Sequence, residues 1–292
     1  MTRGYITLAT GRREFIEMAV NLVLSLRKFD PDKEFCLLHD QSIEFLTPQT
    51  RALFHHLGDV RECPSKPSIA NLNKLLGFEG SPFEETMFID ADCIIVKSDM
   101  DRHWEKMSAQ DFNIAGEKAI GGSWYDLDIA NLCKELGAPY IARMNSGVYY
   151  FNRSEKAEAV FKTSIDLFRE RKELLAVQRK NYNYDYADEP FFGASMGVNR
   201  IDPASYTPEE GSIMITTLHA KNVEFDLASE TSRIDKPAGF WIAGRFLAKK
   251  WVRHSPTIAH FIKLKPKKVY QALSDQLRDE AGVERFNFSA FS

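Results

Sequence analysis

Two aspartates that stand one residue apart, Asp90 and Asp92, are the residues of this sequence best placed to carry chemistry. They follow the apolar run 86–89, which is typical of a buried strand, and open α/β sheets bind ligands at the carboxyl ends of strands. Side chains alternate along extended backbone, so both carboxylates are expected to point the same way. Paired carboxylates suit Mn²⁺ or Mg²⁺, which can neutralise the charge of a departing diphosphate. An Asp-x-Asp sequence in a solvated turn is the alternative.

A third metal ligand is expected at His260, in the segment 257–261. A borderline metal such as Mn²⁺ accepts an imidazole beside carboxylates. A histidine among apolar residues can equally be a core residue with its hydrogen bonds satisfied. The lysines that follow it favour a phosphate site, and they are Lys263, Lys265, Lys267 and Lys268.

The elements that must position these residues alternate between strands and helices. A strand over 4–10, an amphipathic helix over 14–29 and a strand over 35–38 predict a βαβ unit, the start of a parallel sheet covered by helices. Gly121 and Gly122 indicate a loop. Further strands are predicted at 86–89, 94–96, 112–115, 147–151 and near 212–217 and 257–261, and further helices at 47–57, 68–76, 155–179, from 188 and from 266.

Composition limits the class of protein and its partners. With 292 residues, 44% of them hydrophobic, the chain can bury a large core. The formal net charge of −3 argues against a nucleic-acid binder. Charge is uneven, because the segment 233–278 is rich in Lys and Arg and contains only two acidic residues, Asp235 and Asp275. This basic region could meet phosphate, a polyanionic acceptor or an anionic membrane, or it could be a solvated face.

Cysteines and hydropathy indicate the compartment. None of the four cysteines forms a CxxC pair, which argues against a zinc cluster, and Cys36 and Cys93 lie in apolar runs typical of the core. Charges near the N-terminus interrupt any secretory signal, and no apolar run is long enough to span a membrane. We therefore expect a cytoplasmic protein without a transmembrane segment, with peripheral contact at the inner membrane face through the basic C-terminal region.

Several segments, in order from Gly4 to about Tyr270, resemble GT-A-type glycosyltransferases close to family 8, the group that contains glycogenin and bacterial lipopolysaccharide galactosyltransferases. Lys74-Leu75 precedes the aspartate pair as a Lys-Leu does in that family. The other similar segments are Ile6-Thr7-Leu8-Ala9-Thr10, Leu24-Ser25-Leu26-Arg27, Asn145-Ser146-Gly147-Val148, Asp188-Glu189 and His260-Phe261.

This resemblance implies an α/β fold of the GT-A type, a Rossmann-like mixed sheet flanked by helices, as in nucleotide-diphospho-sugar transferases. It implies a catalytic domain over 1–270 and a C-terminal helical extension over 271–292. The implied activity is metal-dependent, retaining hexosyl transfer from a UDP-sugar to a carbohydrate, glycolipid or protein acceptor. The implied site consists of metal ligands Asp90, Asp92 and His260, donor contacts Thr7, Leu8, Ala9, Thr10, Lys74, Ala91 and Lys265, and sugar-pocket residues Asn145, Asp188 and Glu189.

The sequence departs from the family pattern near the late histidine. The family continues with Gly and then Lys-Pro-Trp, whereas here Lys263 replaces the Gly, Lys265-Pro266 comes one residue early and the Trp is absent. Glu189 stands where the family has an amide. These changes bear on the phosphate contacts and on the identity of the donor sugar.

Structural roles compete with functional ones at several positions. Lys74 could be an exposed helix lysine, Asn145-Ser146-Gly147 a turn, and Asp188 a helix N-cap. Two other functions stay open. A sugar-phosphate nucleotidyltransferase would need a Gly-rich phosphate loop, and the opening strand leads into a segment with a single glycine, Gly11. A nucleotide-sugar or glycan-binding protein with a decayed site would explain the altered segment after His260.

Overall fold

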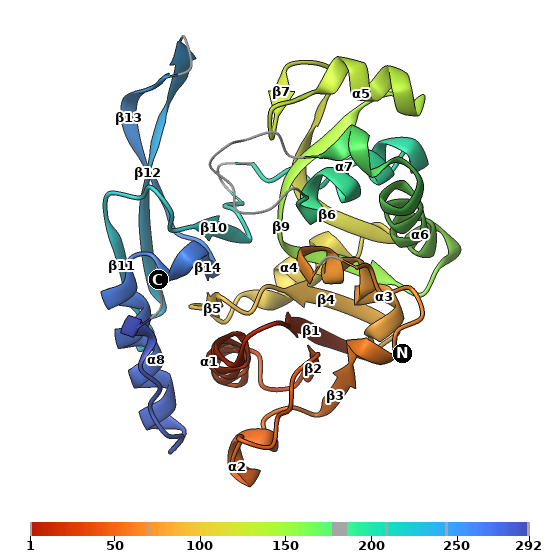
Figure 1. The fold of residues 1–292 in the computed structure, drawn as a ribbon. Coiled ribbons are helices and arrows are strands. Elements are labelled where there is room, and N and C mark those ends of the chain that lie inside the picture. Colours follow the sequence, from red (N-terminus) through yellow and green to blue (C-terminus); the bar gives the residue numbers. More distant parts are fainter. Residues whose placement is uncertain (1, 69, 177–185, 208–209, 243–244, 291–292) are drawn as a thin grey trace.

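A six-stranded sheet lies at the centre of the molecule (Figure 1). The computed structural model describes residues 2–68, 70–176, 186–207, 210–242 and 245–290. The strand order is β3-β2-β1-β4-β9-β6, and β9 runs antiparallel to both of its neighbours in an otherwise parallel sheet. The strands are β1 (Arg3–Ala9), β2 (Glu34–His39), β3 (His56–Asp59), β4 (Glu85–Ile89), β6 (Phe112–Ala119) and β9 (Ile141–Asn152).

The order of these strands creates a ligand crevice. The chain passes from β1 outward to β2 and β3, and then returns to place β4 on the other side of β1. Connections therefore diverge beyond the carboxyl ends of β1 and β4, the point of an open α/β sheet where ligands bind. The aspartate pair follows β4 directly.

A second sheet places His260 at the same crevice. It consists of β10 (Met214–Thr216), β14 (Ile258–His260) and β5 (Cys93–Ile95), in that order. β14 and β5 are antiparallel, with His260 opposite Cys93. The pairing brings His260 next to Asp92, although the two are far apart in sequence.

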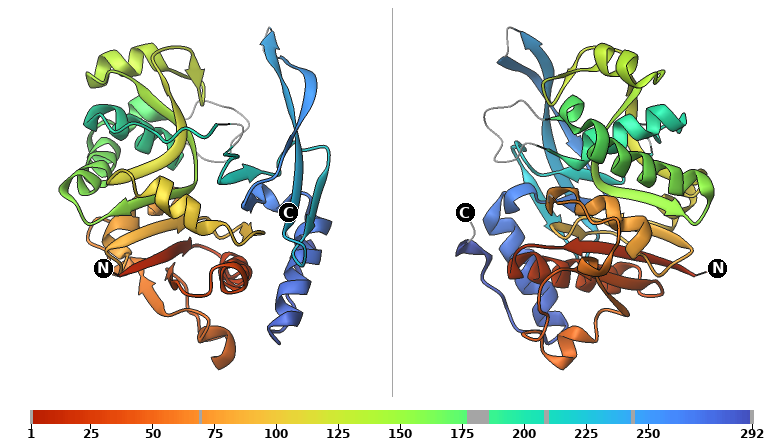
Figure 2. Two further views of the ribbon diagram at one scale, coloured as in Figure 1. Left: turned by 180° about the vertical axis from the view of Figure 1, so that it is seen from behind. Right: turned by 45° about the vertical axis from the view of Figure 1, so that its right-hand side comes forward.

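Helices cover both faces of the central sheet. Alternate strand residues belong to two apolar cores: Tyr5 and Met87 pack with α1, α4 and α8, whereas Ile6 and Phe88 pack with α5, α6 and α7. α1 and α8 lie side by side, joined by a hydrogen bond from Asn21 to the Tyr270 hydroxyl (Figure 2). The helices are α1 (Arg13–Phe29), α2 (Pro48–Arg51), α3 (Gly77–Gly80), α4 (Met100–Met107), α5 (Ile129–Leu136), α6 (Glu155–Arg171), α7 (Asp188–Asn199) and α8 (Lys267–Glu280), with 3₁₀ turns η1 (Val60–Glu62), η2 (Ala70–Leu76), η3 (Lys172–Leu175), η4 (Ile262–Leu264) and η5 (Phe288–Ala290).

Two further β elements were not anticipated from the sequence. A short hairpin, β7 (Ser123–Trp124) and β8 (Leu127–Asp128), follows the predicted glycine loop. A separate antiparallel sheet consists of β11 (Val223–Asp226), β12 (Thr231–Ile242) and β13 (Arg245–His254). Beyond β11, the β12–β13 ribbon extends away from the central sheet (Figures 1 and 2). Its distal sequence is almost continuously apolar and lacks the alternation that identifies a strand.

Several predicted elements were wrong in extent or type. The helix predicted over 47–57 ends at Arg51, because Leu57 belongs to β3 and pairs with β2. The predicted helix 68–76 is the 3₁₀ turn η2. α6 ends at Arg171 and η3 continues to Leu175, while 177–179 lie outside the described residues. No helix in the described part of the chain combines the length and apolarity needed to cross a membrane.

Candidate functional site

Backbone hydrogen bonds fix the aspartate pair in the crevice. The amide of Asp90 donates to the Gly147 carbonyl of β9 at 2.8 Å, and the amide of Phe261 donates to the Asp92 carbonyl at 3.0 Å. The turn after β4 is therefore held on one side by β9 and on the other by the residue that follows β14. This arrangement brings side chains from three parts of the chain together.

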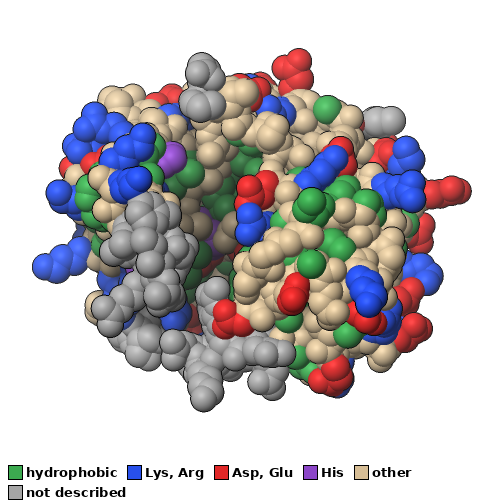
Figure 3. Space-filling view, turned by 90° about the horizontal axis from the view of Figure 1, so that it is seen from above, with side chains coloured by type: hydrophobic (Ala, Val, Ile, Leu, Met, Phe, Trp, Pro, Cys, Tyr) green, Lys and Arg blue, Asp and Glu red, His purple; other side chains and the backbone are tan. Residues whose placement is uncertain are grey.

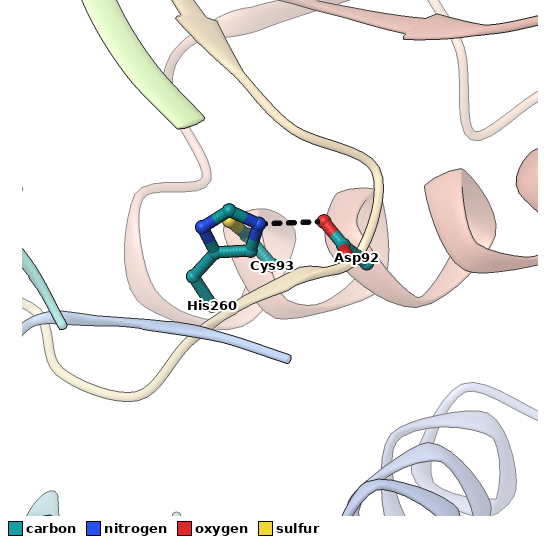
Figure 4. A group of neighbouring side chains, drawn as sticks. All are labelled: Asp92, Cys93 and His260. Carbon is teal, nitrogen blue, oxygen red and sulfur yellow. Dashed lines mark ion pairs between the residues drawn. The ribbon is translucent and has the colours of Figure 1, made fainter. Parts of the chain in front are cut away.

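His260 faces both aspartates. Its Nε2 atom lies 3.1 Å from Asp92 Oδ1 and 3.7 Å from Asp90 Oδ2. The ring is almost fully buried, and its Nδ1 atom has no hydrogen-bond partner among the described residues. Figure 4 shows the ring of His260 turned toward Asp92, with the Cys93 side chain beside them.

The charges in this group perturb one another. Burial raises the pKa of Asp90, and Lys74 and His260 offset this only in part. Burial would also raise the pKa of Asp92, but the His260 ring outweighs it and lowers that pKa below its usual value. Burial would lower the pKa of His260, yet Asp92 and Asp90 raise it. The group therefore stabilises a cation beside these two carboxylates.

The spacing of these atoms fits a divalent metal ion. Two ligands at right angles on one ion, each about 2.1 Å from it, lie about 3 Å apart. The separations of 3.1 and 3.7 Å from His260 Nε2 are close to that value. Asp92, Cys93 and His260 offer ligand atoms within 4.8 Å of one another. Burial raises the pKa of the Cys93 thiol far above its usual value, which disfavours the thiolate needed for metal binding, so Cys93 fits the core role predicted for it.

Lys74 lies inside the site rather than on the surface. It projects from η2, donates a hydrogen bond to Asp90 Oδ2 at 2.8 Å and to the Ser146 hydroxyl at 3.1 Å, and lies 3.6 Å from Asp188 Oδ2. Burial acts to lower the pKa of Lys74, but the Asp188 and Asp90 carboxylates outweigh it and raise the pKa. The alternative of an exposed helix lysine is therefore wrong, and Lys74 is a fixed positive charge in the crevice.

The start of α7 brings two more carboxylates to Lys74. Ala187 is the N-cap residue, so the alternative of Asp188 as the N-cap is wrong. Asp188 Oδ2 is buried without a hydrogen bond, since its distance to Lys74 makes an ion pair only. Glu189 accepts hydrogen bonds from the Tyr125 hydroxyl and, at 3.2 Å, from the Ser146 amide. Burial and the Asp188 carboxylate raise the pKa of Glu189 to about 7.

Asn145, Ser146 and Gly147 lie within β9, so the alternative of a turn is wrong. The β6–β9 pairing shifts register opposite this segment, because Gly116 pairs with Met144 and Ile114 with Tyr149. A Cβ atom on Gly147 would lie only 2.8 Å from His260 Nδ1, so this glycine leaves room for the imidazole.

A cavity of about 330 Å³ adjoins Asn145 and is also lined by Val148, Tyr206 and Met214. Met214 connects it to the metal-ligand group, because a Cβ atom on Gly147 would lie 2.8 Å from Met214 Sδ as well as from His260. In the space-filling view the molecule is hollowed between two lobes (Figure 3). The cavity is at the lower end of the size range of small-molecule sites.

The remaining predicted donor contacts differ in their burial and in whether they lie at the crevice. Thr7 and Ala9 are fully buried in β1, Ala91 is buried in the turn, and Leu8 and Thr10 are partly exposed. The Thr10 hydroxyl accepts a hydrogen bond from Asn73, next to Lys74, at 3.4 Å. Lys265 has an exposed side chain, and its carbonyl accepts a hydrogen bond from the Thr217 hydroxyl. Thr10 is therefore at the crevice, whereas the Thr7 and Ala9 side chains face the core.

Sequence reasoning missed three residues of the site. Tyr125 reaches Glu189 from the turn of the β7–β8 hairpin, and Met214 lies on β10. Ser146 stands inside the Asn-Ser-Gly segment, but its contacts with Lys74 and Glu189 were not foreseen. The glycines before β7 predicted a loop, but they did not indicate that Tyr125 belongs to the site.

Comparison with solved structures identifies the fold. The galactosyltransferase LgtC, solved with donor and acceptor sugar analogues, is similar with a TM-score of 0.53 and 12% identity over 95% of each chain. The bifunctional glycosyltransferase WbbM has a TM-score of 0.49 and 13% identity over 73% of this chain, which spans only 40% of WbbM. Mouse xyloside xylosyltransferase 1 has a TM-score of 0.43 and 11% identity, covering 74% of this chain and 88% of its own.

No protein-family model matches the sequence, and no curated protein matches it. The likeness to LgtC, which spans nearly the whole of both chains, confirms the predicted α/β fold of the GT-A type.

Proposed function

We propose that this protein is a metal-dependent glycosyltransferase that takes a sugar from a nucleotide-sugar donor, with UDP as the nucleotide. The observation that carries the proposal is the excess of carboxylates at the switch point of the sheet, with side chains that are buried or at most 25% exposed. Asp90, Asp92, Asp188 and Glu189 meet there around Lys74, with His260 beside the first two. Negative charge of this density, held largely out of solvent, calls for a bound cation.

Asp90, Asp92 and His260 would hold Mn²⁺ or Mg²⁺, which supplies a positive charge beside the diphosphate of a bound donor. Lys74 already carries a fixed positive charge next to Asp90, and a charge set in position before reaction needs little reorganisation when a diphosphate departs. Thr10, just after β1, and Asn73 of η2 would line the nucleotide side of the crevice.

Asn145, Asp188 and Glu189 would line the sugar side. Asp188 presents a buried oxygen that lacks a hydrogen bond, so a sugar hydroxyl could donate to it. Glu189 is fixed by Tyr125 and the Ser146 amide, which limits its freedom to rotate. The cavity beside Asn145 could admit an acceptor hydroxyl to the same face of the sugar as the leaving diphosphate, as retaining transfer requires.

A donor screen tests this function. UDP- and GDP-sugars are incubated with the protein and Mn²⁺, and release of the nucleoside diphosphate is measured with and without acceptor sugars. Asp92→Asn should lower the rate with the active donor by at least about 10²-fold, because it removes one anionic ligand with little change of shape. Asp279→Asn, on the exposed face of α8, is the matched control and should keep the full rate.

Three outcomes would contradict the proposal. Equal rates for Asp92→Asn and wild type at limiting Mn²⁺ would rule out the proposed metal site. Release of pyrophosphate from a nucleoside triphosphate and a sugar phosphate would indicate a nucleotidyltransferase. Tight binding of UDP and Mn²⁺ with no turnover of any donor, including hydrolysis, would indicate a binding protein.

A further inference from the structure

Lys236, in the inner part of β12, is a half-buried lysine that the sequence analysis did not single out. Its ammonium donates a hydrogen bond to the Thr216 hydroxyl at 3.2 Å and another to the Leu218 carbonyl. Thr216 is the last residue of β10, and Leu218 lies just beyond that strand. These bonds fasten the inner part of β12 to the end of β10, a strand of the second sheet (Figure 1).

The register of the second sheet places this ammonium near the proposed metal ligands. Thr216 is paired with His260 in the parallel ladder of β10 and β14. Paired residues on neighbouring strands project from the same face of a sheet, and the strands lie about 4.8 Å apart. The Thr216 hydroxyl and the His260 ring therefore share one face of the sheet, and Lys236 reaches that face from β12.

The positive charge of Lys236 is not balanced within the described part of the chain, where no carboxylate forms an ion pair with it. The neighbouring Asp235 is engaged by Arg233 at 2.7 Å and by the Asn222 amide at 2.6 Å. An ammonium has three N–H donors, and the third donor of Lys236 has no acceptor among the described residues. Burial lowers the pKa of Lys236, and no carboxylate opposes this effect. A partly buried cation in these surroundings calls for an anion.

The proposed metal site needs a further positive charge if it is to hold a diphosphate. Asp90 and Asp92 would balance the charge of a divalent ion, and Asp188, 3.6 Å from Lys74, balances the charge of that lysine. Negative charge grows on the diphosphate as it departs, and cations already fixed in position stabilise it. A cation on the His260 side of the crevice would supply this stabilisation.

We propose that Lys236 binds a phosphate oxygen of the nucleotide-sugar donor, an inference that rests on the proposed function. The ammonium would keep its bonds to Thr216 and Leu218, and the third N–H would donate to the phosphate. Lys265, which was predicted to contact the donor, has an exposed side chain, so Lys236 is the more firmly held of the two charges. An anionic acceptor could attract the same ammonium, and measuring nucleotide binding without an acceptor distinguishes the two.

Calorimetry of UDP binding at saturating Mn²⁺, without an acceptor, tests the inference. Lys236→Met removes the charge and keeps most of the side-chain stem. It should weaken UDP binding about tenfold or more, the effect expected for the loss of a hydrogen bond to a charged group. The affinity for Mn²⁺ without nucleotide should not fall, because Lys236 bonds to Thr216 and Leu218 and not to a proposed metal ligand.

The matched control is Lys97→Met. Lys97 is also half-buried, and it also donates to a hydroxyl and a carbonyl, both of Ser255. It follows β5 at the end of the second sheet away from His260, because Cys93 at the start of β5 is the residue opposite His260. The control variant should therefore bind UDP as tightly as wild type.

Unchanged UDP affinity in Lys236→Met would overturn the inference and leave the proposed function standing. Equal losses in Lys236→Met and Lys97→Met, or a lower affinity for Mn²⁺ without nucleotide, would assign Lys236 a structural role and overturn the inference as well. A wild-type protein that binds no UDP would contradict the proposed function, and this inference with it. Should Lys236→Met fail to fold, Lys236→Gln, which has no charge but can still donate hydrogen bonds, is judged by the same criteria.

Discussion

Replacing Glu189 with glutamine should change how the stability of the protein depends on pH. Burial and the neighbouring Asp188 carboxylate raise the pKa of Glu189 from its ordinary 4.5 to about 7. The folded protein therefore holds a proton on Glu189 that the unfolded chain releases between pH 4.5 and 7, so the free energy of unfolding falls as the pH rises through this window. The contribution is fully present below pH 4.5 and is lost above pH 7.

The magnitude follows from the size of the pKa rise. A rise of about 2.5, at about 1.36 kcal/mol for each pH unit, corresponds to about 3 kcal/mol. Exposure to solvent does not reduce this figure, because Glu189 is buried. Glutamine keeps the shape and cannot ionise: its oxygen can accept from the Ser146 amide and its NH₂ group can donate to the Tyr125 oxygen.

Urea denaturation of wild type and Glu189→Gln between pH 4 and pH 8, with a chelator present, measures the effect. The two proteins should be about equally stable at pH 4, and the variant should be more stable by about 3 kcal/mol at pH 8. Taking the difference at each pH cancels the titration of groups that both proteins share. A difference that stays constant across the range, or a variant that becomes the less stable protein at pH 8, would refute the assignment of a proton to Glu189.

Three further substitutions probe other parts of the structure. Gly147→Ala places a Cβ atom 2.8 Å from His260 Nδ1, so the Mn²⁺ affinity measured by calorimetry should fall and the protein should lose about 1–3 kcal/mol of stability. An unchanged Mn²⁺ affinity would show that His260 is not a metal ligand. Asp188→Asn should leave the affinity for UDP and Mn²⁺ nearly intact and lower turnover by about 10²-fold or more. Loss of UDP binding would instead place Asp188 in contact with the nucleotide. Arg278→Met leaves the buried Glu17 carboxylate without its 3.0 Å partner and should lower the free energy of unfolding, measured by chemical denaturation, by about 3–5 kcal/mol. A decrease of less than about 1 kcal/mol would contradict a buried ion pair between α8 and α1.

Local patterns were sufficient for part of the central sheet, but not for those of its strands whose identity depends on a partner. β1, α1 and β2 follow their predictions closely, because their apolar residues recur with the period of each element. Leu57 was predicted to end a helix and instead pairs with Leu37, since a free edge of the sheet outweighs local helix propensity. A turn was the structural alternative for Asn145-Ser146-Gly147, because Asn and Gly favour turns, whereas these residues lie within β9, whose flanking residues pair with β4 and β6.

The sequence by itself determined the aspartate pair at the end of a buried strand, because strand periodicity and the position of polar residues are local properties. Only the tertiary structure decided which charges meet. Lys74 and Asp188 come within 3.6 Å because η2 and the start of α7 meet at one edge of the sheet, and His260 faces Asp92 because β14 pairs with β5. The raised pKa of Glu189 likewise depends on burial and on the Asp188 carboxylate, and hydrogen bonds from Tyr125 and Ser146, which lie 64 and 43 residues away in sequence, offset the rise only in part. Contacts of this kind depend on how distant elements pack, and the spacing of residues along the chain does not specify them.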